Sequence, residues 1–425
     1  MSRLPPAVVL GIEEISAGLT VVRELGEHGV PVYGIAHWQS AALHSRWLTR
    51  GYLHPGLDKA LVELINRIAE TTGASFLVAV NELDAVFARR AADAGELRGL
   101  RPLVAPLDKL QLVNDKAATY RIAQEVGIAV PWTWQPQSTD EIADPPAGLT
   151  FPCILKFADP YKAAPLLARH GLVLSKVQYC YDKQQLDRFL LDYARAGCYP
   201  MVQSYSPGRG LCDMLFMHRG EAVLRFRHLR MTEWPPAGGI VAICQSLPID
   251  EDDTLFAKSE ALLRRIGWEG AAQVEYRHDP ATGRTVLMEV NGRFWSGQAL
   301  AYHAGAPFAW LTYAILGLEK PVTVPPYKVD LVCISAATEM RRLLTLLFRR
   351  NKLQNPESKF NRWAEVARFL RYLLDPRTRF YLFSWKDPMP FLADTALKIR
   401  RGAGLLLRIA VRRPGEDAKP RAAAD

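Results

Sequence analysis

The first 105 residues alternate short apolar runs with helical stretches, and this alternation limits the possible folds more than any other feature of the chain. The apolar runs are Ala7–Ile12, Val30–Ile35, Phe76–Val80 and Leu103–Ala105. Residues with helical spacing lie between them, at Ala17–His28 and Lys59–Thr71. Strands that alternate with helices form parallel sheets with right-handed crossovers. We therefore expect a small α/β domain over about the first 110 residues.

The turn after the first run does not have the spacing of a dinucleotide site. It reads GIEEISAG, which lacks the G-x-G-x-x-G pattern that lets a backbone approach a pyrophosphate. A plain α/β unit is the better interpretation of this segment.

The following residues indicate antiparallel strands and a few helices. A helix is predicted over Lys116–Glu125, and strands over Phe151–Phe157 and Pro200–Tyr205. Two hairpins follow, one that turns at Arg219–Gly220 and one that turns in the Asp279–Gly283 loop. This part of the chain is predicted to be an α+β body.

The second hairpin places several polar side chains on one face. Glu289, Asn291 and Arg293 alternate along its return strand and point the same way. The register across the short turn can bring Glu275 onto that face as well. Close carboxylates repel unless a cation lies between them, and Mg²⁺ prefers carboxylate and phosphate oxygens. The spacing fits a Mg²⁺ site and fits equally well solvent-facing carboxylates paired with arginine.

Two lysines favour the metal interpretation. Lys156 lies within CILKF, where its apolar neighbours require the ammonium to reach a partner or water. Lys116 begins a helix, where backbone N–H groups and a cation can hold phosphate oxygens. Either lysine alone is more typical of a structural or solvated side chain. Together with the acidic hairpin they indicate phosphates held between cations and a metal.

With these elements the chain resembles the ATP-grasp superfamily, in its carboxylate–amine ligase branch. The segments that carry the resemblance are, in the order of the superfamily, NDKAATYRIAQEVGIAVPWTW, FPCILKF, MVQSYSPGRG, RFRHLRMTEWPPAGG and QVEYRHDPATGRTVLMEVNGRFWSG. The resemblance covers about Pro5 to Leu318. It implies an ATP-grasp fold, of α/β and α+β class, with ATP held between two subdomains.

The resemblance also implies domain boundaries. Residues 1–112 would form a Rossmann-like pre-ATP-grasp domain, and residues 113–325 the ATP-grasp domain. Within the latter, a lid subdomain would cover about residues 130–205 and a C-terminal subdomain about residues 206–325. Residues 326–425 would form a basic, partly helical C-terminal extension.

The matching motifs imply the nucleotide-binding residues. Lys116 and Lys156 match the two lysines that bind nucleotide phosphates. Val202–Tyr205 matches the hinge strand whose backbone meets the adenine edge, so Gln203, Ser204 and Tyr205 are expected there.

The same motifs imply the metal and catalytic residues. Glu275, Glu289 and Asn291 match the metal ligands. Arg293 matches the arginine that steadies the transferred phosphate, so Arg293 and Lys156 are the catalytic candidates. The cofactors implied are ATP and Mg²⁺, with Mn²⁺ as an alternative metal.

Two positions depart from the superfamily. Ser204 stands where a glutamate usually follows Gln203, so a carboxylate contact to the nucleotide is lost while backbone contacts remain. The segment ADPYKAAPLLARHGL lacks the usual glycine-rich lid loop, and Lys162 or Lys176 could cover the phosphates instead.

The RFRHLR and PPAGG segments supply candidates for the substrate site. Arg227 and Arg230 lie on opposite faces of a predicted strand, and an arginine on either face can bind an anion through two hydrogen bonds. Gly238 and Gly239 permit a loop to approach a ligand closely. A solvated basic strand is an equally good interpretation.

The net charge of +9 belongs to the C-terminal end of the chain. Residues 341–425 carry 20 Lys and Arg against 8 Asp and Glu, a net +12 that leaves −3 for the first 340 residues. Leucines mixed with these arginines favour a lipid surface or a protein partner over nucleic acid, and packing on the enzyme body fits equally well. The sequence indicates nothing about oligomeric state.

The remaining features predict a cytoplasmic protein that is able to lie at the inner membrane surface. The six cysteines form no CxxC pair, the start of the chain does not look like a secretory signal, and no apolar stretch has the length of a membrane span. The expected function is an ATP-dependent ligase of the acid–amino-acid or acid–amine type. The alternative is a nucleotide-binding protein without catalysis that docks to a membrane or partner through its basic tail.

Overall fold

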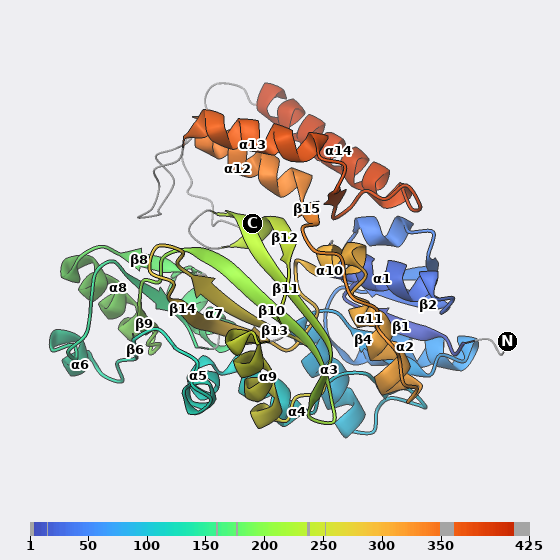
Figure 1. Cartoon of the computed structure of the whole chain (residues 1–425), viewed down its shortest axis with the longest axis horizontal. Coiled ribbons are helices and arrows are strands. Elements are labelled where there is room, and N and C mark those ends of the chain that lie inside the picture. The colour runs from blue at the N-terminus through green and yellow to red at the C-terminus, as the bar shows by residue number, and fades with distance from the viewer. Residues whose placement is uncertain are drawn as a thin grey trace.

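The computed structural model describes residues 4–14, 16–158, 160–175, 177–235, 239–250, 252–348 and 361–411. These residues form three sheets, each packed against helices, and Figure 1 shows the N-terminal sheet and the small antiparallel sheet on opposite sides of a large central sheet. The mixed α/β and α+β class that the sequence predicts is confirmed.

The N-terminal unit is a parallel sheet with strand order β3-β2-β1-β4-β5. Its strands are β1 (Ala7–Leu10), β2 (Val32–Ala36), β3 (Leu48–Leu53), β4 (Phe76–Ala79) and β5 (Arg101–Pro102). Its helices are α1 (Ala17–Glu27), η1 (Ala41–His44), α2 (Lys59–Thr72) and α3 (Glu82–Asp93). The predicted alternation of strands and helices is confirmed.

One strand of this sheet lies elsewhere than predicted, and two elements were not predicted. The last strand is β5, at Arg101–Pro102, and the apolar run Leu103–Ala105 that follows it is buried without being a strand. An apolar run indicates that a segment is buried, and a buried loop can have the same pattern as a buried strand. β3 is a largely exposed strand without an apolar run, and α3 begins at the capping residue Asn81 after a polar loop.

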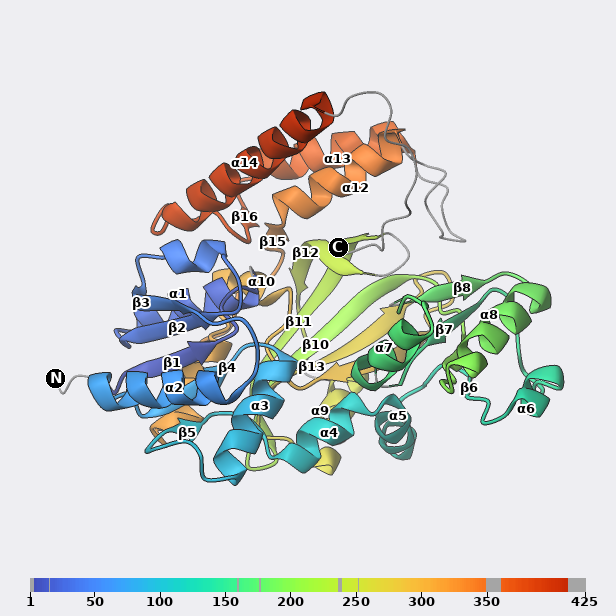
Figure 2. The ribbon, with the colours of Figure 1, turned by 180° about the vertical axis from the view of Figure 1, so that it is seen from behind.

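The linking helices lead to a small antiparallel sheet with order β6-β9-β7-β8. The linking helices are α4 (Leu107–Asn114) and α5 (Lys116–Glu125). The strands are β6 (Thr133–Trp134), β7 (Cys153–Lys156), β8 (Gln178–Cys180) and β9 (Met201–Ser204). The helices are α6 (Thr139–Ala143), α7 (Pro160–Arg169) and α8 (Lys183–Arg195). This unit has its own apolar core, and Figure 2 shows it at the opposite end of the molecule from the N-terminal sheet.

The central sheet has seven strands in the order β14-β13-β10-β11-β12-β15-β16. The strands are β10 (Arg209–His218), β11 (Glu221–Trp234), β12 (Ile240–Leu247), β13 (Gly270–His278), β14 (Thr285–Asn291), β15 (Val332–Ile334) and β16 (Thr378–Phe380). The helices beside it are α9 (Thr254–Ile266), α10 (Gln298–Ala304), α11 (Phe308–Leu311) and the π-helix η2 (Thr312–Gly317). Both predicted hairpins, β10–β11 and β13–β14, are confirmed.

The core residues continue from the N-terminal unit into the central sheet. One cluster joins Val9 and Leu19 of the N-terminal unit to Phe216 of β10 and Phe308 of α11. A second cluster fills the space between β13 and helices α4, α5 and α9. The N-terminal unit and the central sheet are therefore held together by continuous apolar packing, which fixes the two sides of the space between them.

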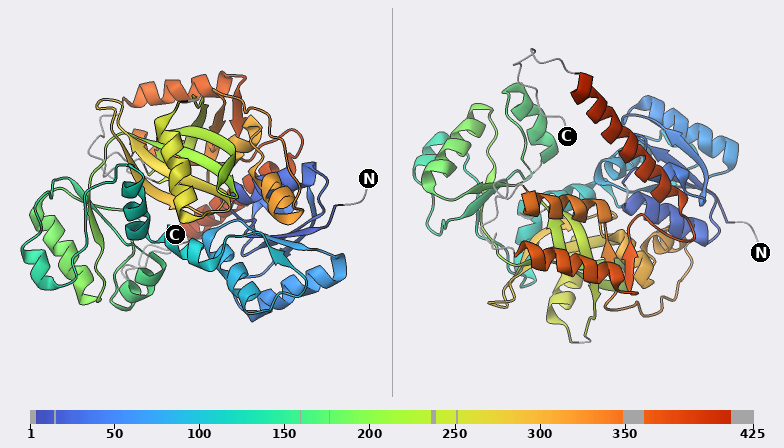
Figure 3. Two further views of the ribbon diagram at one scale, coloured as in Figure 1. Left: turned by 60° about the horizontal axis from the view of Figure 1, so that its bottom comes forward. Right: turned by 90° about the horizontal axis from the view of Figure 1, so that it is seen from above.

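The C-terminal residues pack on the rest of the molecule. β15 and β16 extend the central sheet. Helices α12 (Ala336–Phe348) and α13 (Arg362–Leu374) lie over it, and α14 (Met389–Val411) packs against η1 of the N-terminal unit (Figures 1 and 3). Packing on the enzyme body, one of the interpretations left open by the sequence, is what the described residues do. Within the described ranges, no helix combines the length and apolar character that crossing a bilayer requires.

A buried ion pair fastens this C-terminal part to the N-terminal unit. Arg23 on α1 donates from Nε to Asp387 at 3.0 Å and from Nη2 to the Leu382 carbonyl at 2.9 Å. Ser45 Oγ and the Arg46 N–H also donate to the Asp387 carboxylate, at 2.7 and 2.9 Å. Three donors around one buried carboxylate offset the cost of removing it from water.

Candidate active site

The β13–β14 hairpin places the predicted metal ligands next to one another. Glu275 and Glu289 are direct cross-strand partners, and Asn291 lies opposite Gln273. Side chains opposite one another on an antiparallel pair share a face of the sheet. The structure therefore brings Glu275, Glu289 and Asn291 together, in the register that the sequence left open.

Glu275 lies in a buried network of arginines and carboxylates. Arg230 on β11 forms ion pairs with Glu275 and, at 3.1 Å, with Glu233. Arg277 reaches Glu233 from the other side at 3.3 Å. Glu275 is therefore paired with an arginine but does not face solvent, and this pairing fixes its carboxylate at the edge of the site.

Glu289 lies beside nitrogen groups of α5 and of its own strand, β14. Lys116, the first residue of α5, places Nζ 3.5 Å from Glu289 Oε2. Asn291 Nδ2 donates to Glu289 Oε1 at 3.3 Å, and Arg293 Nη2 donates to Asn291 Oδ1 at 3.2 Å. The predicted metal ligands, a predicted phosphate lysine and the predicted catalytic arginine are thus one connected group.

Lys156 enters the same group from β7 of the small sheet. Loss of water around its ammonium, only partly offset by the charge of Glu289, lowers the pKa of Lys156 from its usual value to about 8. Lys116 and Arg277 lower this pKa further, and Glu275 raises it. Lys156 therefore shares the electric field of the acidic hairpin although the two lie in different sheets.

The hinge strand β9 ties the small sheet to α5. Gln203 is fully buried, and its amide donates to Tyr120 Oη at 3.2 Å and Thr133 Oγ1 at 3.0 Å. The Ser204 N–H donates to the Trp132 carbonyl at 2.9 Å. The Tyr205 ring lies 6.0 Å from that of Tyr179. The Gln203 amide nitrogen is occupied by these bonds, whereas its buried Oε1 has no hydrogen-bond partner among the described residues.

The substrate candidates divide between two places. Arg230 and Gly239 line the large cavity described below. Arg227 points away from it, because its guanidinium is bound by Asp213 at 2.6 Å and by Asp253. Gly238 lies outside the described residues, as does Lys176, and no side-chain position is described for Lys162.

A cavity of about 1150 Å³ lies between the N-terminal unit, the central sheet and the C-terminal residues. Glu275, Glu289, Asn291 and Arg293 line it. The other predicted nucleotide residues, Lys116, Lys156, Gln203, Ser204 and Tyr205, are not among the described residues that line it. The acidic hairpin thus lines the cavity, whereas Lys116, which pairs with Glu289, does not.

Much of the cavity wall comes from residues that the sequence analysis did not single out. Apolar side chains line one part, from both ends of the chain: Trp38, Leu57, Leu83, Ile240, Phe380, Phe383, Phe391 and Ile399. Polar side chains line the ends of the N-terminal strands: Glu13, Glu14, His37, Asn81, Glu82 and Asp84. Each of these polar residues follows a strand of the parallel sheet. The rule that ligands bind at the carboxyl ends of such strands would have found them.

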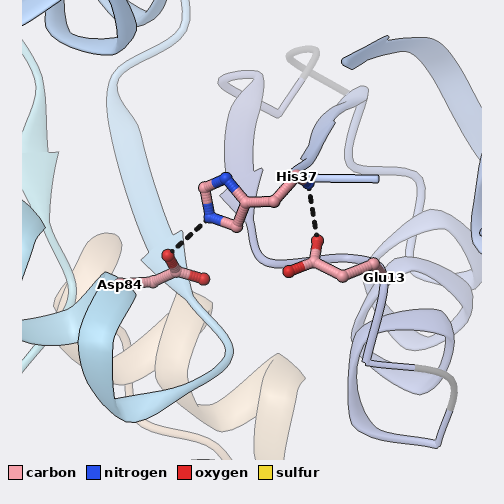
Figure 4. A group of neighbouring side chains, drawn as sticks. All are labelled: Glu13, His37 and Asp84. Atoms are coloured by element: carbon pink, nitrogen blue, oxygen red, sulfur yellow. Dashed lines mark hydrogen bonds and ion pairs between the residues drawn. The ribbon is translucent and has the colours of Figure 1, made fainter. Parts of the chain in front are cut away.

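Three of these residues interact directly with one another (Figure 4). The backbone N–H of His37 donates to Glu13 Oε2 at 3.1 Å, and the ring nitrogen Nε2 of His37 lies 2.9 Å from Asp84 Oδ1. The hydrogen bond to Asp84 raises the pKa of His37 from its usual value to about 9, against the effect of burial. Burial raises the pKa of Glu13 as well.

The donor atoms of the acidic hairpin fit Mg²⁺. Glu275, Glu289 and Asn291 offer two carboxylates and an amide oxygen on one face, and Mg²⁺ is a hard cation that takes oxygen ligands. Lys116 Nζ lies 3.5 Å from Glu289 Oε2, and the charges of Glu275 and Glu289 act on the Lys156 ammonium. The arrangement can hold the charged end of a nucleotide against the wall of the cavity.

Comparison with known proteins points to the same part of the chain. Residues 239–315 match the family model described as the ATP-binding domain of the carbamoyl-phosphate synthase L chain. A curated relative, the arginine-specific large chain of carbamoyl phosphate synthase from Halalkalibacterium halodurans, is 23% identical over 246 residues. That match covers 52% of this chain and 22% of the relative, so the chain spans about a fifth of its length.

Several solved structures share the fold at low sequence identity. The N5-carboxyaminoimidazole synthetase from Staphylococcus aureus has a TM-score of 0.60 at 12% identity, over 82% of this chain and 88% of that one. The L-amino acid ligase from Bacillus licheniformis has a TM-score of 0.55 at 14% identity, over 76% of each chain. The biotin carboxylase domain of the Hydrogenobacter thermophilus 2-oxoglutarate carboxylase, in complex with MgADP, ADP and bicarbonate, has a TM-score of 0.59 at 14% identity, over 77% and 73%.

Proposed function

Because the chain has the ATP-grasp fold, we propose that it is an ATP- and Mg²⁺-dependent ligase that activates a carboxylate as an acyl-phosphate and joins it to an amine. Within this class we propose an acid–amino-acid or acid–amine ligase. The similar solved structures include an L-amino acid ligase, which supports the amino-acid form.

One observation carries the proposal. The cross-strand pair Glu275 and Glu289 lines a large cavity, and Glu289 also pairs with Lys116, which is not among the described residues that line it. A phosphate held at Glu289 would therefore face a second molecule in that cavity. Phosphoryl transfer needs this arrangement, because catalysis rests on positioning and on stabilising charge on the transferred oxygens.

The site residues would have separate roles in binding the nucleotide, the metal ion and the transferred phosphate. Lys116 and Lys156 would bind the phosphate oxygens of ATP, and the β9 backbone would hold the adenine edge. Glu275, Glu289 and Asn291 would hold Mg²⁺, which neutralises charge on the phosphate oxygens when it is bound. Arg293, fixed by Asn291 Oδ1 at 3.2 Å and by the Phe294 carbonyl at 2.9 Å, would steady the transferred phosphate on the cavity side.

The cavity would hold the carboxylate and the amine. A substrate carboxylate beside Arg230 and Arg293 would accept the phosphate and form the acyl-phosphate. The amine would then attack the acyl carbon and release inorganic phosphate. A site closed in by the C-terminal helices would keep water from hydrolysing that intermediate.

The experiment is a screen for phosphate release by the full chain. Carboxylates would be supplied in pairs with amino acids and simple amines, with ATP and Mg²⁺, and ADP and phosphate measured. We expect release only when Mg²⁺, a carboxylate and an amine are all present. Tight ATP binding without phosphate release across the whole panel would instead support the nucleotide-binding protein that docks through its basic tail.

The cellular location is also part of the proposal. None of the six cysteines is disulfide-bonded, which suits the reducing environment of the cytoplasm. Association of the basic C-terminal end with a membrane surface stays a prediction of the sequence, and so do Mn²⁺ as an alternative metal and the domain boundaries.

A further inference from the structure

Three chemically reactive side chains outside the acidic hairpin meet at the carboxyl edge of the N-terminal sheet. Glu13 follows β1, His37 directly follows β2, and Asp84 lies in the first turn of α3 after β4 (Figure 4). β1 stands between β2 and β4 in the strand order, where the chain changes from one side of the sheet to the other. Crevices at such a switch point are where open α/β sheets bind ligands.

The ligand atoms of the three side chains converge. One atom from each, an imidazole nitrogen and two carboxylate oxygens, lies within 4.8 Å of the other two. Glu13 is 2% exposed and Asp84 is 1% exposed, while His37 is only partly buried. All three line the large cavity, so the cluster is closed on the protein side and open on the cavity side.

Each carboxylate has one oxygen without a hydrogen-bond partner among the described residues. These are Glu13 Oε1 and Asp84 Oδ2, both buried. Figure 4 shows the free oxygen of each carboxylate turned toward the other carboxylate. Buried polar atoms without partners are costly, and two carboxylates that face each other need a proton or a cation between them.

The imidazole is held with its second nitrogen toward these carboxylates. His37 Nδ1 lies 2.9 Å from the His54 carbonyl oxygen, which can only accept, so Nδ1 carries a hydrogen. Nε2 is therefore the atom left to face Asp84 and Glu13. A backbone carbonyl that fixes the tautomer in this way is the usual support behind a histidine that binds a metal.

The backbone also makes room for this arrangement at Gly11. Gly11 has φ +84°, and a Cβ atom there would lie 2.1 Å from Asp84 Oδ2. Only glycine lets the Asp84 carboxylate come against the end of β1. The close approach of Asp84 to Glu13 thus requires glycine at position 11.

We propose that Glu13, His37 and Asp84 bind a divalent transition-metal ion of the Zn²⁺ type, with His37 Nε2 and one oxygen of each carboxylate as ligands. An imidazole beside two carboxylates suits Zn²⁺, Co²⁺, Mn²⁺ or Fe²⁺ better than Mg²⁺, which takes oxygen ligands. Three protein ligands leave a coordination position open, and here it faces the cavity. The site is separate from the one at Glu275 and Glu289 and places a second positive charge in the cavity.

Co²⁺ serves as the probe, because its visible absorption reports coordination by the protein. The full chain would be treated with a chelator, desalted and titrated with Co²⁺, and Zn²⁺ would then be added to displace it. We expect one tightly bound Co²⁺ that Zn²⁺ displaces. Absence of a Co²⁺ signal in the folded protein overturns the proposal and leaves a proton, or the ammonium of a substrate, as the group between the carboxylates.

Variants assign the signal to the cluster. His37→Gln and Asp84→Asn should each weaken Co²⁺ binding by more than about 100-fold, since a ligand is lost and loss of a supporting residue alone costs about 10–100-fold. His218→Gln is the matched control, because His218 also pairs with a carboxylate, Glu269, at 3.1 Å but lies outside the cavity. Unchanged Co²⁺ binding in both cluster variants contradicts the assignment.

Two further variants keep the test independent of folding and of the proposed ligase activity. Asp84→Cys should bind Co²⁺ and add a thiolate absorption band in the near ultraviolet, a signal that misfolding cannot produce. Glu289→Gln should lose phosphate release and keep Co²⁺ binding. If Glu289→Gln removes the Co²⁺ signal and Asp84→Cys adds no band, the ion lies at the acidic hairpin and the proposed site is wrong.

Discussion

Glu275 on β13 and Glu289 on β14 are direct cross-strand partners, and each carboxylate is paired with a different cationic side chain. Glu275 is paired with Arg230 from the cavity side of the sheet, and Glu289 lies 3.5 Å from Lys116 Nζ on the nucleotide side. A β-bulge immediately after Glu275 shifts the register beyond this pair. We propose that the two carboxylates mark the boundary between the space for a nucleotide and the space for an organic substrate.

Glu289→Gln tests the metal assignment. The amide keeps the shape of the side chain but removes the charge that offsets Lys116 and holds the metal. We expect Mg²⁺-dependent phosphate release to fall by about 100-fold or more, the size of effect that loss of one charge-stabilising group produces. Glu269→Gln, which alters a surface pair with His218, is the control. Equal activity of the two variants would refute the assignment.

Lys156 predicts a pH dependence of ATP binding. The pKa of Lys156 is lowered to about 8 in the free protein. Its side chain is therefore positively charged below pH 8 and loses this charge as the pH rises above that value. The affinity for ATP should therefore decrease above about pH 8. Lys156→Arg keeps its charge at high pH and should bind ATP with little change over the same range. Calorimetric titration from pH 6.5 to 9.5 measures both, and parallel profiles would contradict the role given to Lys156.

Asp387→Asn tests the attachment of the C-terminal part. The substitution leaves Arg23 buried with an uncharged partner, and breaking a buried ion pair typically costs about 3–5 kcal/mol. We expect a lower denaturation midpoint and faster protease cleavage after residue 382. Asp375→Asn, which alters the more exposed pair with Arg377, should change neither. Equal stability of the two variants would show that apolar packing alone holds the segment.

Phe391→Ala tests whether the C-terminal helix forms part of the substrate site. Phe391 lies in α14, lines the cavity and packs 5.4 Å from the Phe383 ring. Its loss should raise KM for the carboxylate or the amine by about tenfold, as expected for burying most of an aromatic side chain against a ligand. KM for ATP should not change. Leu370→Ala, on α13 and outside the cavity, is the control, and a matching rise in that variant would point to a general loss of stability.

Local sequence patterns were enough to predict the hairpin and the helix that bring Glu289 and Lys116 together. Alternation along β14 put Glu289 and Asn291 on one face, and the N-terminal helix signals placed Lys116 at the start of α5; Arg293 was expected on the same strand but lies two residues beyond its end. These predictions depend only on spacing within one strand or helix. The ion-pair partner of Glu275 comes from β11, which lies two strands away in the sheet. Spacing within the β13–β14 hairpin therefore cannot predict it.

The cavity required long-range contacts that no local pattern records. Trp38 and Phe391 lie 353 positions apart in the sequence and line one space, because Arg23 and Asp387 fasten the C-terminal residues to α1. Arg227 shows the opposite case. Its position on a basic strand predicted an anion site, and the structure instead binds it to Asp213 and Asp253. A charge pattern in the sequence identifies an arginine but not the carboxylate with which it forms an ion pair.

The central claim is that a carboxylate oxygen attacks the terminal phosphate of ATP at this site. Once the screen identifies a carboxylate substrate, that compound would be labelled with ¹⁸O in its carboxyl group, and the released phosphate would be analysed by mass spectrometry. We expect ADP as the nucleotide product and one ¹⁸O atom in each phosphate released. Unlabelled phosphate, or release of AMP and pyrophosphate, would contradict it.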